Sequence, residues 1–380
     1  MPSSLVHRQP ARILPRSLSI SVPGTDKDHL FFHRYQEQVS HDLGGTFGLT
    51  FYKDAVLQDC HVFPTIWHLS VAVAAIATSV TYKRSDTQRQ DHYQFALRHV
   101  NTALRSLRQS LEENAGNARM AVSACGLLCA FETIQGNYQN SRNQLVSGRK
   151  VFDKWRTGAD TALGYSLVST TFDFELWEMF RRLELNFSLY AAHNPIDDVV
   201  FAGDKDVTIF ENLHFTTAAQ GRWLSYGLFY TISKFQRKAG LFKRSHWPEP
   251  LPILLRQEGE DLLRKIEIYL ECFRLVMRDY EHTPFYLIYL TGFNWCRISI
   301  NTVMATEECM HDQYLDTYQQ IISDAKLLQE VERTSVNATT SLMDVELSLP
   351  LFCTGARCRD AKLRRDAISI LQTYPRRQSL

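Results

Sequence analysis

Apolar side chains recur along most of the chain at the three- and four-residue spacing of an α-helix. In the segment DKDHLFFHRYQEQVSHDL, Phe31, Phe32, Tyr35 and Val39 fall on one side of such a helix. This period indicates an amphipathic helix rather than a strand, whose side chains would alternate. We therefore predict a helix over residues 26–43.

Both ends of that helix carry signals of their own. Thr25 precedes it and Asp28 follows three residues later, which is the spacing of a capping box, where each side chain accepts a hydrogen bond from the other residue's backbone N–H. At the far end, Gly44 and Gly45 are suited to the left-handed conformation that terminates many helices.

The next segments continue the helical pattern. FYKDAVLQDC predicts a short helix, and Pro64 suits the first turn of the helix that follows, because that turn needs no N–H donor. Residues 69–80, LSVAVAAIATSV, form the most apolar window, yet it falls well short of the roughly 20 residues that span a bilayer. We predict a buried helix there and no contact with a membrane.

Three longer helices are predicted between residues 88 and 156. The first, over 88–111, is an amphipathic surface helix. Its apolar side carries Phe95, Val100, Leu104, Leu107 and Leu111, opposite Arg98, Arg105 and Arg108. The segment RMAVSACGLLCAFETIQ is apolar almost all round and predicts a central helix. A turn at Gly136 and Asn137 joins it to NYQNSRNQLVSGRKVFDKW, which we expect to pack back on it.

Helices are predicted over most of the remaining chain, and no segment reads convincingly as an alternating strand. The predicted ranges are 165–190, 217–239, 252–280, 284–306, 310–332, 340–353 and 360–372, with long loops at 193–206 and 242–252. The expected fold is all-α, an irregular, solenoid-like array of stacked antiparallel helix pairs. It would form one domain over residues 26–380, after a flexible basic N-terminal arm over residues 1–25.

The amino-acid composition excludes several classes of protein. With 380 residues, of which 44% are hydrophobic, the chain can bury a sizeable core, so disorder of the whole chain is excluded. The net charge of +1 provides no general attraction to nucleic acid or anionic membranes. Eight cysteines are too dilute for a disulfide scaffold, several of them lie in apolar segments, and the N-terminus has no apolar secretory stretch. A reducing compartment is expected.

The segment CTGARCRDAKLRR, residues 353–365, looks at first like a zinc-held, DNA-reading element. Cys353 and Cys358 are five positions apart, however, so on a helix they point in different directions. Zinc also needs about four ligands, and no second pair with suitable spacing exists in the sequence. We interpret both as ordinary thiols near a helix junction, and the basic side chains that follow, such as Lys362 and Arg365, as a solvated helix face.

Several segments together resemble one known family. PGTDKDHLFFHRYQEQVSHDLGGTF is similar to the opening of the all-helical regulatory domain, the middle-homology-like domain, of fungal transcription factors of the binuclear zinc-cluster class. NTALRSLRQSL resembles a later helix of that domain, and LLCAFETIQGNYQNSRNQLVSGRKVF resembles its Phe-Glu helix, Gly-Asn turn and a helix ending in Ser-Gly. LPLFCTGARCRDAKLRRDAISIL resembles its late Cys-Arg-Asp segment.

The resemblance implies a nuclear regulator, with a cytoplasmic location as the alternative. Such domains respond to effectors and contact other proteins, and many relatives control metabolic or secondary-metabolite gene clusters. The six cysteines of the zinc cluster do not precede Pro23, so we expect no direct sequence-specific DNA binding. The expected partners are proteins, among them a DNA-binding transcription factor, and a small-molecule effector.

Residues that suggest an enzyme have simpler explanations. Asp197 and Asp198 form the one acidic doublet near suitable aromatics for a terpene cyclase, but no third acid follows at the usual spacing and the context predicts a turn. His61 and His68 lack a third metal ligand. Cys125 and Cys129 share a helix face, yet the helix is so apolar that packing is favoured over redox chemistry.

Aromatic side chains leave two interpretations open. They can line a cavity for an apolar effector or simply fill the core, and the second is favoured because aromatics are usually buried. The set comprises Trp67, Trp177, Trp223, Trp295, Phe172, Phe174, Phe229, Phe293, Tyr286 and Tyr289. We therefore assign no catalytic, cofactor-binding or metal-binding residue and expect no cofactor.

Together with the family resemblance, the sequence favours a transcription regulator-like protein that is not an enzyme. One alternative is a cryptic all-α enzyme or hydrophobic small-molecule binder of a biosynthetic pathway. Another is a plain helical scaffold.

Overall fold

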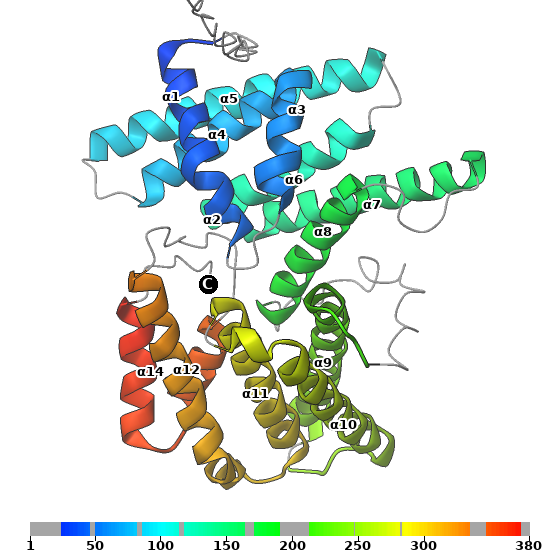
Figure 1. The fold of residues 1–380 in the computed structure, drawn as a ribbon, viewed down its shortest axis with the longest axis vertical. Helices are drawn as coiled ribbons and strands as arrows, with labels where there is room; N and C mark the ends of the chain where they lie inside the picture. Colours follow the sequence, from blue (N-terminus) through cyan, green and yellow to red (C-terminus); the bar gives the residue numbers. More distant parts are fainter. Residues whose placement is uncertain are drawn as a thin grey trace, which may run out of the picture.

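The computed structural model describes residues 24–45, 50–81, 86–113, 118–163, 171–190, 213–246, 248–281, 283–334 and 347–373. Within these ranges every regular element is a helix and none is a strand, as Figure 1 shows. The all-α prediction is confirmed. The flexible arm over residues 1–25 and the loop over 193–206 fall almost entirely outside the described residues.

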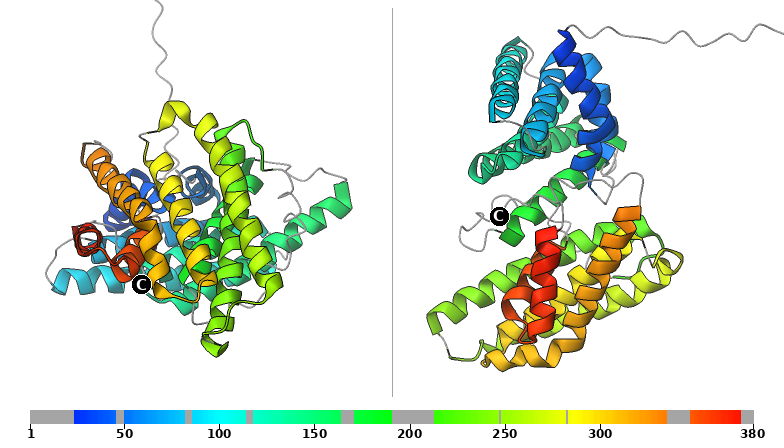
Figure 2. Two further views of the ribbon diagram at one scale, coloured as in Figure 1. Left: turned by 90° about the horizontal axis from the view of Figure 1, so that it is seen from below. Right: turned by 90° about the vertical axis from the view of Figure 1, so that its left-hand side faces the viewer.

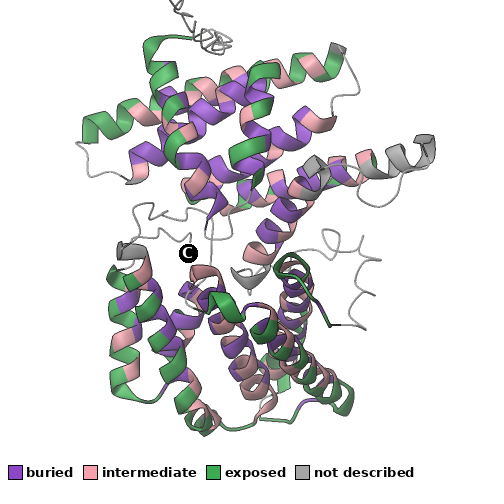
Figure 3. Cartoon of the chain, viewed as in Figure 1, coloured by how far each residue is buried: buried purple, intermediate pink, exposed green. Residues whose placement is uncertain are grey.

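Helices of the first half surround one central helix. They are α1 (Asp26–Arg34), the π-helix η1 (Tyr35–Val39), α2 (Ser40–Gly44), the π-helix η2 (Phe51–Ala55), α3 (Val56–Val62), α4 (Pro64–Thr81), α5 (Asp86–Glu113), α6 (Ala118–Ile134), α7 (Tyr138–Leu163) and α8 (Thr171–Tyr190). Helix α4 packs against α1, α3, α5 and α6. Its middle is buried, as is most of α6 (Figure 3). The predicted buried helix is confirmed, and no helix in the described part of the chain is long and apolar enough to cross a membrane.

The helix predicted over residues 26–43 begins and ends as its sequence predicts, although a π-helical turn, η1, lies between α1 and α2. The Oδ2 atom of Asp28 accepts a hydrogen bond from the backbone N–H of Thr25 at 2.8 Å, and the Thr25 hydroxyl accepts one from the N–H of Asp28 at 3.3 Å. This capping box satisfies donors that the first turn leaves without helical partners. Gly45 has φ of 60° at the C-cap of α2, a left-handed conformation that suits glycine.

Helix α5 buries Phe95 and Val100 of the predicted stripe but not the leucines near its C-terminal end. Leu104 and Leu111 are 43% and 44% exposed, while Ala96 and Ala103 are fully buried beside Phe95. Small side chains on this face allow α5 to lie close against α4, its main neighbour, and the larger leucines are turned outward. The predicted apolar stripe is therefore wrong at its C-terminal end.

Helices α6 and α7 form the predicted antiparallel pair. Gly136 adopts φ of 81° in the turn between them, and the helices pack along much of their length. Gly148 lies inside α7 rather than at a helix end, so the helix does not stop at Ser-Gly. The absence of a side chain at Gly148 lets α7 approach α6 and α8, because a Cβ there would lie 2.7 Å from the Cβ of Cys125.

The second half has its own apolar core. Its helices are α9 (Ala218–His246), α10 (Ile253–Val276), the 3-10 helix η5 (Arg278–Tyr280), α11 (Pro284–Met304), the 3-10 helix η6 (Glu308–Tyr314), α12 (Leu315–Thr334), α13 (Ser348–Arg357) and α14 (Ala361–Thr373). Buried side chains form two clusters, one contributed by residues 31–183 and the other by residues 215–370. Figures 1 and 2 show the corresponding two groups of helices, with α8 reaching from the first toward the second. The assignment of residues 26–380 to one domain stays a prediction.

Two boundaries in the second half differ from the predicted ones. Helix α9 continues to His246, where the rings of Phe242 and His246 stack at 4.3 Å, so the predicted loop over 242–252 begins later. Helix α13 (Ser348–Arg357) continues past the predicted end at residue 353, and the predicted start at residue 340 lies outside the described residues. Pro350 lies in its first turn, where the missing N–H costs no helical hydrogen bond.

Candidate functional site

The segment between α13 and α14 makes a sharp junction. Helix α13 ends at Arg357, and the C-cap residue Cys358 has φ of −64° and ψ of 132°, which are extended rather than helical. Asp360 then caps α14, because its Oδ1 accepts hydrogen bonds from the backbone N–H of Lys362 at 2.9 Å and of Leu363 at 2.8 Å. The basic residues of the sequence motif are thereby distributed over the end of α13, the junction and α14.

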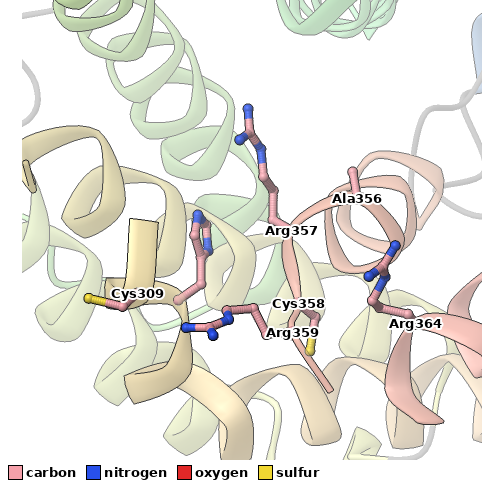
Figure 4. Close-up of a pocket in the computed structure, with 7 residues that line it drawn as sticks. Cys309, Ala356, Arg357, Cys358, Arg359 and Arg364 are labelled. Carbon is pink, nitrogen blue, oxygen red and sulfur yellow. The ribbon is translucent and has the colours of Figure 1, made fainter. Parts of the chain in front are cut away.

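A pocket of about 400 Å³ opens between this junction and η6. Its lining is mostly basic or sulfur-containing and consists of Cys309, His311, Ala356, Arg357, Cys358, Arg359 and Arg364. We call it the basic pocket. In Figure 4, Arg359 extends from the junction toward η6, while Arg357 and Arg364 extend from α13 and α14.

The charges at the basic pocket are predominantly positive. Arg359 pairs with Asp312 at 2.7 Å, but both side chains are largely exposed, so the pair is weak and can exchange with solvent ions. The Nε atom of Arg364 donates to the carbonyl oxygen of Gly355 at 3.2 Å, a neutral acceptor that does not balance the guanidinium charge. None of the described residues that line the pocket is acidic.

The two cysteines of the basic pocket are not activated. The Cys309 thiol donates to Glu307 at 3.1 Å, and this hydrogen bond to a carboxylate raises the pKa of the thiol. Burial raises the pKa of Cys358. Both thiols therefore stay protonated near neutral pH, whereas nucleophilic cysteines are thiolates. Within the described residues, no group of three or more possible metal ligands gathers here or elsewhere.

The cysteines singled out in the sequence have the structural places that it predicts. Cys353 lies within α13 and Cys358 caps it, and both are free thiols at a helix junction. Burial raises the pKa of Cys125 to about 11 and that of Cys129 to about 12. The Cys129 sulfur lies 3.1 Å from the Ser141 hydroxyl between α6 and α7, which confirms packing as its structural setting.

His68 does not lie beside His61, with which the sequence suggested a pair, but beside another histidine. His61 is exposed on α3, whereas His68 of α4 lies beside His99 of α5, with 3.1 Å between their Nδ1 atoms. The Nε2 atom of His99 is 3.1 Å from Oδ1 of Asp28, the residue of the capping box. The cluster thus links the start of α1 to α4 and α5. The sequence did not connect His99 or Asp28 with His68, because both lie far from it along the chain.

The histidine cluster predicts a loss of stability in mild acid. Burial lowers the pKa of both His68 and His99, although Asp28 opposes the shift. A histidine whose pKa is lower when folded binds fewer protons than it does unfolded, so stability decreases as pH falls through the unfolded value of about 6.5. Relative to His68→Gln, the wild type is expected to lose free energy of unfolding, measured in urea, between pH 7 and 5. The comparison between the two proteins cancels the opposite contribution of Asp324, whose pKa burial raises to about 6. His61→Gln should keep the wild-type slope, and an unchanged slope in His68→Gln would contradict the assignment.

The acidic doublet and the aromatic set, both considered in the sequence analysis, differ in how far the structure describes them. Asp197 and Asp198 lie outside the described residues. Of the aromatic set, Phe172 and Phe174 have no described side chains, and the others belong to or pack against the two apolar clusters. Trp67 is 2% exposed and the ring of Phe293 stacks on that of Phe229 at 4.2 Å. The core interpretation is confirmed for these residues.

The first group of helices has a recognisable family signature. Residues 29–178, from α1 into α8, match the family model of the fungal specific transcription factor domain. The predicted resemblance is confirmed over these residues. The fungal transcription factor match covers the helices around α4 and includes the segments NTALRSLRQSL and LLCAFETIQGNYQNSRNQLVSGRKVF. It supports a role in transcription regulation, and this family is not an enzyme family.

The fungal transcription factor match ends before the second group of helices. No curated protein and no solved structure matches the chain. The late Cys-Arg-Asp segment, and with it the basic pocket, lies outside residues 29–178. Its resemblance to the family stays a prediction, as does the expected lack of a zinc cluster. The pocket itself was missed in the sequence because η6, which completes it, lies about 45 residues from the junction.

Proposed function

We propose that this protein is a nuclear transcription regulator that controls a metabolic or secondary-metabolite gene cluster. It acts through contacts with other proteins and through a small effector, without a zinc-cluster module of its own. The single observation that carries the proposal is the match of residues 29–178 to the fungal specific transcription factor domain. Its DNA-binding partner is a separate transcription factor.

The two groups of helices suit a protein that transmits a signal. The matched group and the group that bears the basic pocket meet at α8 and α9, where Trp177 and Trp223 stack at 5.7 Å. Arg222 of α9 also pairs with Glu178 of α8 at 2.8 Å. Packed aromatic rings and a largely desolvated ion pair favour one arrangement of the two groups, which supports their action as one unit.

Deleting the gene is expected to change transcript levels of a group of neighbouring genes, measured by RNA sequencing. Reintroducing the full chain should restore them, and a fluorescent fusion should accumulate in the nucleus. Co-purification should recover a zinc-cluster transcription factor with the tagged chain. Unchanged transcripts together with accumulation of a pathway intermediate would contradict regulation and favour the alternative, an all-α enzyme of that pathway.

A further inference from the structure

One cysteine of the second group of helices lies in contact with a histidine. The Sγ atom of Cys272, on α10, is 3.3 Å from the Nδ1 atom of His214, which lies just before α9. Cys272 packs against the second apolar cluster and is half-buried, whereas His214 is exposed, so the pair lies at the edge of the core. A thiol with an imidazole nitrogen at this distance has a base that can take its proton.

Contacts between α9 and α10 hold this pair in place. The hydroxyl of Tyr269, one turn before Cys272 on α10, donates to the carbonyl oxygen of Gly221 near the start of α9 at 2.9 Å. The ring of Tyr269 also lies 5.1 Å from that of Phe215, the residue after His214. Tyr269 and Phe215 are both buried, so the start of α9 is fixed against the turn of α10 that carries the cysteine.

The other cysteines of the chain are held as thiols. Cys309 is exposed, but its thiol donates to a carboxylate oxygen of Glu307 at 3.1 Å, and this hydrogen bond raises its pKa. Burial raises the pKa of the rest, which are Cys60, Cys125, Cys129, Cys296, Cys353 and Cys358. Cys309 and Cys272 thus have opposite partners, a carboxylate that retains the thiol proton and an imidazole that can accept it.

We propose that Cys272 is a site of oxidation by hydrogen peroxide and that His214 moves the proton in this step. The sulfur atom attacks one oxygen of the peroxide, so that an S–O bond forms and the O–O bond breaks. Sulfur is oxidised to the sulfenic acid, and the peroxide is reduced to water. His214 takes the proton of the thiol and passes it to the leaving oxygen. Hydrogen peroxide suits this site because it is small and the cysteine is half-buried. The site does not depend on the proposed regulatory role.

Trapping of the sulfenic acid with dimedone, followed by peptide mass spectrometry, tests the proposal on the full chain. After brief treatment of the reduced protein with hydrogen peroxide, Cys272 is expected to carry the dimedone adduct before any other cysteine. It should precede even Cys309, although Cys309 is the more exposed. Cys272→Ser should remove this early adduct. If Cys309 is labelled first, or both are labelled at equal rates, exposure alone explains the reactivity and the proposal is wrong.

Replacement of His214 tests its part in the reaction. General acid–base catalysis contributes about 100- to 10,000-fold in enzymes, and a thiol depends on it less because it is already a good nucleophile, so His214→Asn should slow the labelling of Cys272 about tenfold. Asparagine keeps a hydrogen-bonding group near the position of Nδ1 but cannot carry the proton. His246→Gln is the matched control, because it removes a histidine from the other end of α9 and should leave the rate unchanged.

Two further outcomes would overturn the proposal. They are a wild-type labelling rate in folded His214→Asn and an equal decrease of the rate in His246→Gln. Thermal unfolding of each variant before oxidation shows whether it is folded. The comparison of Cys272 with Cys309 uses the wild-type chain alone, so it tests the proposal even where a variant does not fold.

Discussion

Replacing Glu178 with alanine is expected to lower the free energy of unfolding by about 3–5 kcal/mol, the cost of removing one partner from a buried ion pair. Glu178 is 5% exposed at the contact between α8 and α9. Its Oε1 forms an ion pair with Nε of Arg222 at 2.8 Å and accepts a hydrogen bond from the hydroxyl of Tyr226 at 3.4 Å. Without the carboxylate, both donors lose an acceptor that water cannot easily replace.

The neighbouring Arg182 increases that cost. It is 4% exposed, and burial lowers its pKa while the side chains of Tyr226, Tyr289 and Glu178 act in the opposite direction. One of its guanidinium N–H groups donates to the carbonyl oxygen of Gly44 at 2.9 Å, at the end of α2. Removing the negative charge of Glu178 therefore leaves a buried cation with less compensation.

Urea unfolding of purified variants, followed by circular dichroism, measures this effect. Glu260→Ala is the matched control, because it removes an exposed glutamate from the interior of α10 and should change stability by less than about 0.5 kcal/mol. Glu178→Gln keeps the shape of the side chain and should fall between the two. Similar unfolding midpoints for Glu178→Ala and Glu260→Ala would show that the network contributes little.

This network shows how the two groups of helices depend on each other. The residues of the fungal transcription factor match end at Glu178 itself, and the partners of that carboxylate, Arg222 and Tyr226, lie in the second group. The matched segment therefore does not contain all the contacts that satisfy its last buried charge. In the matched segment alone, this carboxylate would lack Arg222 and Tyr226. The second group of helices is therefore part of the structural support of the first.

Local signals in the sequence account for much of the helical pattern. The capping box of Thr25 and Asp28, the turn at Gly136 and the start of α4 at Pro64 each depend on contacts within a few residues, and all three are present in the structure. A window as apolar as residues 69–80 has to be buried wherever it lies. Features of this kind are encoded in short segments and are readable from them.

Features that depend on distant partners were not readable in the same way. The stripe of α5 is decided by α4, against which its alanines fit more closely than Leu104 and Leu111 would. Arg364 and Arg365 are adjacent and chemically identical, and only the fold places one of them at a pocket with η6. The sequence could therefore identify a basic helix face but could not separate the residue that lines a site from its solvated neighbour.

Two glycines likewise have roles that their local sequence does not reveal, and alanine substitutions at both positions test this difference. Gly148 of α7 and Gly240 of α9 both lie inside long helices, so their sequence contexts are similar. A Cβ at Gly148 would lie 2.7 Å from the Cβ of Cys125 and 3.0 Å from Cζ of Phe180, whereas a Cβ at Gly240 has nothing within 4 Å. The first distance joins two atoms fixed close to their backbones, so neither can move aside without a shift of a helix.

Alanine at these two positions is expected to change stability in opposite directions. Gly148→Ala should lower the free energy of unfolding by about 1–3 kcal/mol, because overpacking forces α7 away from α6 and α8. Gly240→Ala should raise it by about 0.5–1 kcal/mol, since alanine loses less conformational freedom than glycine when a helix forms. Urea unfolding of both variants beside wild type measures the two changes. If Gly148→Ala were as stable as Gly240→Ala, the helices around Gly148 would have to be further apart than the structure places them, and the close packing of α7 on α6 would be wrong.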